Sequence, residues 1–300
     1  MNKTCKTILI LVTLIFLLLS YLLNSKYIIE CILDYSILFL TKLFPVNFIF
    51  FIISSLLLDY GIIEYIRKIF RVNSTKTFLF ILSMISGFPS GSKYTNDLLN
   101  KGYINTITAN KYVMFSHFPN PLFILGSVNS LLNDLYLSYA ILFSIIISNF
   151  IIMIFSSDKT NNSSNYITSY NSKNYLTIAV NNSFNIIITI YGISLFYYLI
   201  SCIISKLFAF SGYLYVFICG FFDLTKGVFS TIIVSNIIFK ALFILLFISF
   251  GSLSIHMQVK SILNEGKIKY SYFLLGRIIG TMLSFIIFMF FILIKKDLYL

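Results

Sequence analysis

Two long apolar runs constrain this chain more than any other feature of its sequence. They cover residues 136–155 and 271–294, and Arg277 is the one charged residue inside them. A helix rises ~1.5 Å per residue, so each run is long enough to cross the ~30 Å hydrocarbon core of a bilayer. The chain is 58% hydrophobic and 11% charged, whereas soluble domains have roughly 25% charged residues. We therefore predict an all-α polytopic integral membrane protein of the cell membrane.

A shorter apolar run near the start of the chain, residues 8–23, follows Lys3 and Lys6. This arrangement is typical either of a signal peptide or of a first membrane helix. Because no small-x-small cleavage pattern follows the run, we favour an uncleaved first helix. Residues 27–44 carry three charges among apolar residues, including Lys42, and we interpret them as partly interfacial.

The formal net charge is +12, which raises the question of a nucleic-acid partner. The basic residues gather between apolar runs, where anionic headgroups and the insertion machinery favour them. We therefore expect the bilayer, and no nucleic acid, as the partner of these loops, which we place on the cytosolic side. The clusters are Arg67, Lys68, Arg71 and Lys76; Lys260, Lys267 and Lys269; and Lys295 with Lys296.

Signals for metal, disulfide or enzyme chemistry are weak. The four cysteines show no paired spacing, and two histidines are too few for a multi-histidine metal cluster. No zinc-protease, hydrolase-elbow or phosphate-loop motif is found. We expect a protein that is not an enzyme and that needs no cofactor.

A polar linker divides the chain into two halves of similar size. Residues 156–175 are rich in Ser and Asn and lack apolar periodicity, which indicates a loop. The division gives an N-terminal transmembrane half, 1–155, and a C-terminal half, 176–300. Paired halves of this kind are typical of transporters with internal repeats, so we predict two pseudo-symmetric halves.

The first half contains a candidate re-entrant motif over residues 78–132. The apolar run 78–85 is too short to span a bilayer and is followed by a segment with two Gly, one Pro and three Ser in eight residues, which breaks a helix. We predict a helix over 105–118 with Asn105 as its N-cap. Asn120 and Pro121 then form a cap and first-turn pair for a new helix.

The second half has broken segments at 213–227 and 250–263. The run 213–222 is short and ends at Asp223, and we predict a span over 228–250 after it. Gly251 and Ser252 then break the chain before a short helix over 255–263. Unpaired backbone groups cost several kcal/mol in hydrocarbon, so breaks at membrane depth are tolerated inside protein or beside a water-filled cavity. There, helix N-termini bind anions and free carbonyls bind cations.

Each broken segment also has a plainer interpretation. The 86–93 segment could be a surface turn with a solvated Lys93, and Asn120-Pro121 could be a simple kink. Asp223 is a candidate for ion or proton coupling, or an interfacial acid paired with Lys226. His256 and Lys260 share a helix face and could hold a carboxylate, although a lone histidine is more often structural.

Four of these stretches resemble segments of the YlbJ-type sporulation integral membrane proteins. Residues 86–93 are similar to that family's Ser-Gly-Tyr-Pro-x-Gly-Ala-Lys, and residues 115–128, with Asn120 and Pro121, to its Phe-Ser-Asn…Pro-Leu-Phe-Ile. Residues 223–227 are similar to its Glu-x-Thr-x-Gly, and residues 249–258 to its Phe-Gly-Gly-Leu-Ser-Val-His-x-Gln. The matches are in the same order and span residues 86–258, more than half of the chain.

The resemblance implies a nucleoside-recognition (Gate) domain and a fold related to the concentrative nucleoside transporters. It also implies a role in endospore formation, moving dipicolinic acid from the mother cell across the outer forespore membrane. The chain departs from the family pattern at residues that matter for the site: Asp223 replaces Glu, Ser252 replaces Gly and Ser92 replaces Ala. These departures leave the substrate open.

We therefore predict a secondary transporter of a small organic anion, with dipicolinate as the expected cargo, working by alternating access. Two alternatives remain: a non-transporting scaffold or signalling protein in spore-envelope (cortex) assembly, and a nucleoside permease. The coupling ion and any homo-oligomer stay open. The predicted substrate-binding residues are Gly87, Pro89, Ser90, Gly91, Ser92, Lys93, Asn120, Pro121, Asp223, Thr225, Gly227, Gly251, Ser252, Ser254, His256 and Gln258.

Overall fold

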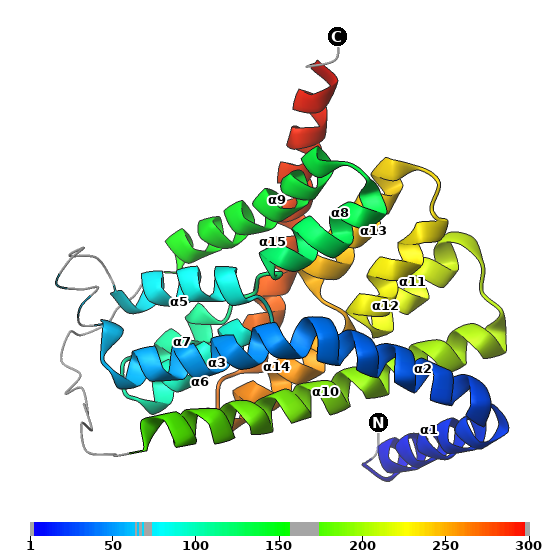
Figure 1. Ribbon diagram of the computed structural model, residues 1–300, viewed down its shortest axis with the longest axis horizontal. Coiled ribbons are helices and arrows are strands. Elements are labelled where there is room, and N and C mark those ends of the chain that lie inside the picture. Colours follow the sequence, from blue (N-terminus) through cyan, green and yellow to red (C-terminus); the bar gives the residue numbers. More distant parts are fainter. Residues whose placement is uncertain (1–2, 64, 66–67, 69–73, 157–173, 298–300) are drawn as a thin grey trace.

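The computed structural model describes residues 3–63, 65, 68, 74–156 and 174–297, and within these ranges all regular structure is helical (Figure 1). The predicted helical fold class is therefore confirmed. Arg67, Arg71 and almost all of the predicted linker lie outside the described residues. Four helices are long and apolar enough to cross a membrane: Leu135–Phe155, Tyr175–Phe208, Ile237–Glu265 and Tyr270–Lys295. A bent pair near the N-terminus makes a fifth if it counts as one span.

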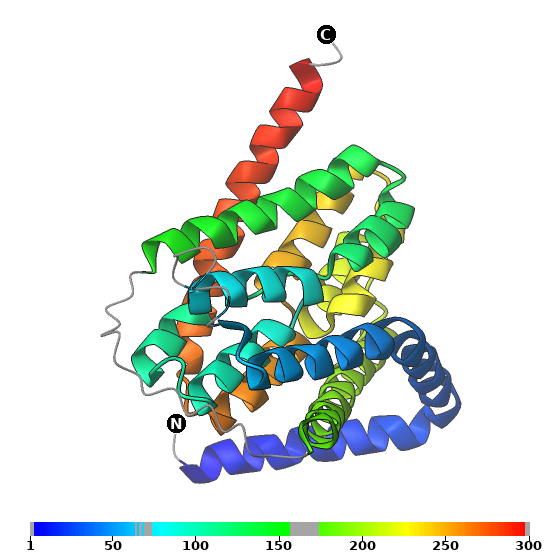
Figure 2. The ribbon, with the colours of Figure 1, turned by 60° about the vertical axis from the view of Figure 1, so that its left-hand side comes forward.

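That bent pair consists of α1 (Lys3–Leu23) and α2 (Ser25–Leu38), which meet at an angle of 98°. Figure 2 shows α1 running beneath the rest of the fold and meeting α2 at one end. The chain then continues through a short π-helix, Phe39–Leu43, into α3 (Phe44–Asp59). Pro45 lies in the first turn of α3, where its missing N–H is tolerated. Pro45 therefore marks the start of α3, which follows directly on the π-helix.

The first hairpin consists of α5 (Ser74–Ser86) and α6 (Ser90–Asn100). The predicted helix break lies between them, where Gly87 has φ +81°, a conformation that glycine adopts without steric cost. The next helix, α7 (Thr106–Tyr112), begins as predicted, because the Asn105 side chain accepts the N–H of Thr108 at 2.8 Å.

The helix predicted over 105–118 ends early, and this prediction is wrong. After Tyr112 the chain turns and continues without regular structure to Asn120. Pro119 disfavours helical backbone in the residue before it. The following helical segment begins at Pro121, as predicted, and its turns are Phe123–Val128 (a π-helix) and α8 (Asn129–Leu132). The Asn120 side chain accepts the N–H of Leu122 at 2.8 Å, and α9 (Leu135–Phe155) completes the half.

The second half begins with α10 (Tyr175–Phe208), followed by a second hairpin, α11 (Gly212–Phe222) and α12 (Leu224–Ser230). A 3-10 turn, Thr231–Ile233, follows, and then α13 (Ile237–Phe250), α14 (Leu253–Glu265) and α15 (Tyr270–Asp297). The span predicted over 228–250 is wrong, because α12 ends and α13 starts anew within it. Asn236 caps α13 by accepting the N–H groups of Ile238 and Phe239, a local preference that ends the preceding helix.

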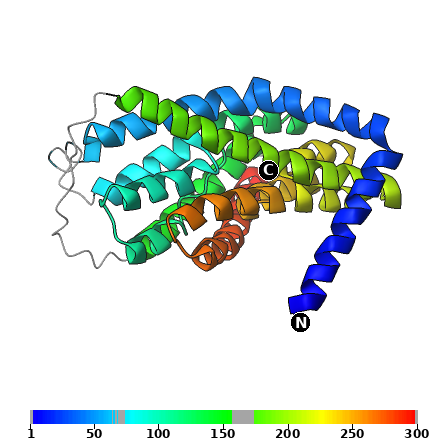
Figure 3. The ribbon, with the colours of Figure 1, turned by 90° about the horizontal axis from the view of Figure 1, so that it is seen from below.

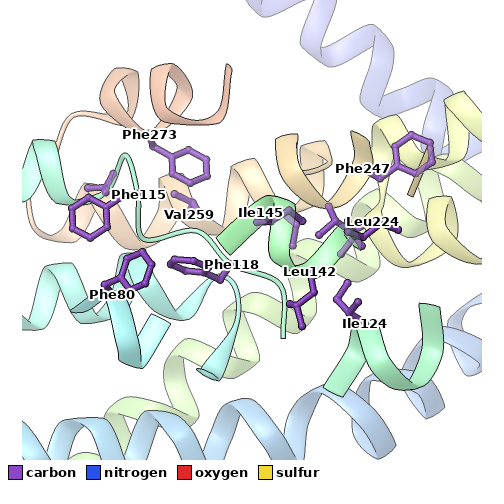
Figure 4. Packing of buried hydrophobic residues seen from close by; sticks show 14 of the residues in the cluster. Phe80, Phe115, Phe118, Ile124, Leu142, Ile145, Leu224, Phe247, Val259 and Phe273 are labelled. Carbon is purple, nitrogen blue, oxygen red and sulfur yellow. The ribbon is translucent and has the colours of Figure 1, made fainter. Parts of the chain in front are cut away.

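The two halves pack together along their length. Helix α10 runs next to α2 and α3 across the whole molecule (Figure 3), and α9 packs along α15. The buried core joins residues of both halves, among them Phe80, Phe118, Phe247 and Phe273 (Figure 4). Many large apolar side chains face outward, such as Ile286, which is 67% exposed. An apolar exterior of this extent suits a lipid environment.

Candidate functional site

A cavity of about 270 Å³ lies between the two halves and is lined by side chains of both. The first half contributes α2, the π-helix after it, α3, the tip of the first hairpin and Asn120. The second half contributes α10, α12 and α14. Six of the predicted substrate-binding residues line this cavity: Pro89, Asn120, Asp223, Thr225, Ser254 and Gln258. Residues from four separate breaks in the sequence are thus brought to one place.

The tip of the first hairpin reaches the cavity because glycines let it pack closely on the irregular segment before Pro121. A Cβ on Gly87 would lie 2.6 Å from the backbone N of Asn120, and a Cβ on Gly91 would lie 1.8 Å from the carbonyl O of Ser116. Such contacts exclude any larger residue without movement of the backbone. Gly87 and Gly91 therefore position Pro89 and Asn120 at the cavity.

The tip of the second hairpin places a carboxylate at the same cavity. Asp223 has extended backbone and is 2% exposed, and its side chain accepts the N–H of Lys226 at 3.0 Å. It is therefore the N-cap of α12. The Lys226 ammonium donates instead to Cys202 Sγ at 2.7 Å. The proposed Asp223–Lys226 ion pair is not formed; the two residues are linked through the backbone.

Several predicted residues hold the second hairpin in place instead of lining the cavity. A Cβ on Gly227 would lie 2.2 Å from Gly220 Cα, so the two helices of the hairpin touch through glycines. The Ser252 hydroxyl donates to the carbonyl of Gly220 at 2.5 Å. Gly251, with φ +88°, makes the turn between α13 and α14. Together these residues fix the break that carries Ser254 and Gln258.

The predicted cationic residues lie away from the cavity. The ammonium of Lys93, whose side chain is 3% exposed, pairs with Asp97 at 2.6 Å. His256 hydrogen-bonds to the Tyr270 hydroxyl at 2.6 Å and to the carbonyl O of Phe250 at 3.1 Å. It lines, with Gly251, a separate and largely apolar cavity of about 470 Å³. Ser90, Gly91 and Ser92 are buried in the first turn of α6, and Pro121 is not among the lining residues.

Sequence reasoning missed Lys42, which is the only basic residue among the described residues that line the cavity. Its position among apolar residues, together with two acids, led us to an interfacial interpretation. Tyr35, Asn47 and Ser194 were also missed, and Ser194 accepts the amide N–H of Gln258 at 2.6 Å. The sequence does show that Lys42 interrupts an apolar run. That pattern alone does not distinguish a lysine that faces a cavity from one that faces the membrane interface.

Arg277 was the second omission, although it is the lone charge in the last apolar run. It is 1% exposed and donates to the carbonyl of Met114 at 2.7 Å and to that of Ser249 at 3.3 Å. It also donates to the side-chain oxygen of Asn149 at 3.1 Å. Met114 lies in the irregular segment that follows α7, and Ser249 lies in the last turn of α13, just before the break at Gly251. One guanidinium therefore satisfies carbonyls beside both breaks.

Comparison with known proteins gives one partial relationship. The chain is 37% identical over 93 residues to the sporulation integral membrane protein YlbJ of Bacillus subtilis (strain 168). That match covers 28% of this chain and 23% of the length of the relative. No protein-family model matches the chain, and no solved structure matches it. With its candidate spans and apolar exterior, the chain is an integral membrane protein related to YlbJ.

Proposed function

We propose that the protein is a secondary transporter of a small organic anion and is not an enzyme. The observation that carries this proposal is the cavity where hairpin tips and broken helices of both halves meet. Breaks of this kind surround the central site of transporters that work by alternating access. A binding site between two halves becomes open to either side when the halves move against each other.

The repeated order of elements supports two pseudo-symmetric halves. Each half has a long helix, then a helical hairpin, then a broken helix, and finally a long span. In the first half the broken helix consists of α7 and the segment from Pro121, and in the second half of α13 and α14. We propose a fold related to the concentrative nucleoside transporters on this order and on the motif resemblance.

The charges at the cavity support coupled transport of an anion. Lys42 supplies the positive charge, and Asp223 supplies a buried carboxylate that pairs with no ammonium among the described side chains. A carboxylate beside an anionic substrate is repulsive. Binding of a proton or a metal cation at Asp223 removes that repulsion, so we propose Asp223 as the coupling site.

Dipicolinate is the cargo that we propose, and its support is chemical. It is a small planar dianion, and the cavity combines one cation with several hydrogen-bond donors, among them the side chains of Asn120, Thr225 and Gln258. The similarity to a sporulation membrane protein supports a role in spore formation. We accordingly propose transport from the mother cell toward the forespore, in the outer forespore membrane.

A nucleoside permease is the second candidate, and the amide side chains favour it. Asn47, Asn120 and Gln258 line the cavity together, and such groups bind neutral heterocycles by hydrogen bonds. Competition by uridine and adenosine in the assay below separates this candidate from an anion transporter.

The test is uptake of labelled dipicolinate into proteoliposomes that contain the purified protein. Asn120→Ala and Gln258→Ala together should abolish uptake, because both side chains line the cavity. Ser90→Ala is the matched control, since Ser90 is buried and lies off the cavity, and it should keep uptake. Folded wild-type protein without uptake under proton and sodium gradients of either sign would overturn the proposal and favour a scaffold in spore-envelope assembly.

A further inference from the structure

A cluster of reactive side chains lies beside the cavity without lining it. It consists of Cys31 on α2, Cys202 on α10 and Lys226 on α12. Helices α2 and α10 run antiparallel to each other, because the hydroxyls of Ser36 and Tyr191 lie 2.7 Å apart and the Lys206 ammonium lies 4.4 Å from the ring centroid of Tyr27. Cys31 and Cys202 lie between these two contacts, although 171 residues (202 − 31) separate them in the sequence. Both cysteines are buried, with Cys31 6% and Cys202 0% exposed. The fold therefore creates a dithiol that spacing in the sequence could not reveal.

Lys226 gives this dithiol a chemical asymmetry. Its ammonium donates to Cys202 Sγ at 2.7 Å and lies 5.1 Å from the ring centroid of Tyr198. Among the described residues it makes no ion pair with a carboxylate. An adjacent ammonium favours the thiolate, which is the nucleophilic form of cysteine. The ammonium therefore favours one thiolate within the pair, and either sulfur can attack while the other resolves.

We propose that Cys31 and Cys202 form a redox-sensitive dithiol that peroxide converts into a disulfide between α2 and α10. The thiolate of the pair attacks one oxygen of hydrogen peroxide, which forms a sulfenic acid and releases hydroxide. The thiol of the other cysteine then attacks the sulfenic sulfur, which forms the S–S bond and releases water. Overall, two thiols and one peroxide give one disulfide and two waters.

The cross-link would join two walls of the cavity. Helix α2 contributes Tyr35 to the lining and α10 contributes Ser194. The same two helices already contact through a hydrogen bond of 2.7 Å between the hydroxyls of Ser36 and Tyr191. Oxidation also changes the sulfur to which the Lys226 ammonium donates, and the backbone N–H of Lys226 binds Asp223. The redox state of the dithiol therefore affects a residue that holds part of the cavity lining in place.

Another buried cysteine, Cys219, provides a matched control. Cys219 on α11 is also buried, and its sulfur lies 3.6 Å from the hydroxyl of Ser205. It has the burial of the pair, but its polar contact is a hydroxyl and not an ammonium. Cys219→Ser should therefore leave the oxidation of the pair unchanged.

The experiment treats the purified full-length protein with hydrogen peroxide and counts free thiols after denaturation by the gel shift of a polyethylene-glycol maleimide. Two of the four cysteines should become unreactive, and tandem mass spectrometry should find the Cys31–Cys202 peptide. Cys31→Ser should form no cross-link, whereas Cys219→Ser should still lose two tags. Lys226→Met should slow cross-linking about tenfold, because the thiolate loses its ammonium.

The wild-type protein alone can overturn the proposal, whatever happens to the variants. Retention of all four tags, at a peroxide dose that oxidises glutathione in the same tube, would do so. A cross-linked peptide that contains Cys5 or Cys219 would do so as well. Because the readout is covalent, it is independent of whether dipicolinate is the cargo.

Discussion

The two hairpins occupy corresponding places in the two halves, but different local chemistry forms their tips. The first tip is a glycine turn at Gly87 with a proline beside it, and it packs on the backbone of Asn120. The second tip is a capping carboxylate, Asp223, on helices that touch through Gly220 and Gly227. Only the second tip therefore brings an ionisable group to the cavity, so the coupling site that we propose belongs to one half, while residues of both halves line the cavity.

The largest expected effect is at the charged tip. Asp223→Asn keeps a side chain that caps helices about as well as Asp, but it removes the negative charge. We expect the thermal midpoint to stay unchanged and ion-driven uptake in proteoliposomes to be lost. Asp223→Ala, which also removes the cap, is the control for folding. Normal ion-driven uptake by the Asn variant would make the two tips equivalent and would remove Asp223 from the coupling mechanism.

The next effect tests whether the glycine packing of the two hairpins is equally tight. Gly91→Ala and Gly227→Ala each force a Cβ against backbone atoms, at 1.8 Å and 2.2 Å. Overpacking of this kind costs about 1–3 kcal/mol, which unfolding in detergent can measure. Gly126→Ala should have no such cost, because a Cβ at that position would have no neighbouring atom within 4 Å. If either hairpin variant is as stable as Gly126→Ala, that hairpin is not held by its glycine.

A smaller effect on uptake is expected at Lys42, which lies outside both hairpins, on the π-helix Phe39–Leu43. Lys42→Gln should raise KM for dipicolinate about tenfold, equivalent to about 1.4 kcal/mol of binding, with little change in maximal rate. The reason is that Lys42 is the one basic side chain in the described part of the cavity lining. Substitution of Lys260, which lies near Tyr270 and away from this cavity, serves as the control. An unchanged KM in the Lys42 variant would mean that the substrate carries no charge at that position.

The smallest effect on uptake is expected at Lys93, which lies in the first turn of α6. Lys93→Met should change uptake by less than about twofold, because its ammonium is engaged with Asp97 and lies off the cavity. The pair is largely buried, with Lys93 3% and Asp97 22% exposed, so removing one partner should cost up to about 3–5 kcal/mol of stability while the folded variant keeps its uptake. Loss of dipicolinate uptake in a folded Lys93 variant would return this lysine to the substrate site.

Local signals in the sequence predicted much of this fold, and long-range contacts explain the rest. Asn105 and Asn120 are caps that their own neighbours identify, and Gly251 marks a break through a glycine-only conformation. Pro119 is a local signal against helix just before it, but α7 already ends at Tyr112, where Gly276 packs closely on Met114, a contact that no local pattern shows. Long-range contacts also decide which residues line the cavity, because Lys42 on the π-helix Phe39–Leu43 lines it together with residues of the second half. Lys93 differs, since its partner Asp97 lies one turn away on the same helix.

Arg277 links the two broken helices through hydrogen bonds to both of them. Its single guanidinium serves the carbonyls of Met114 and Ser249, which come from opposite halves. Any rearrangement that draws these carbonyls apart must abandon one of the bonds, and a buried carbonyl without a partner costs about 1–3 kcal/mol. The halves consequently cannot slide past α15 independently at small cost. Helix α15 therefore holds the two breaks at a fixed separation through the side chain of Arg277.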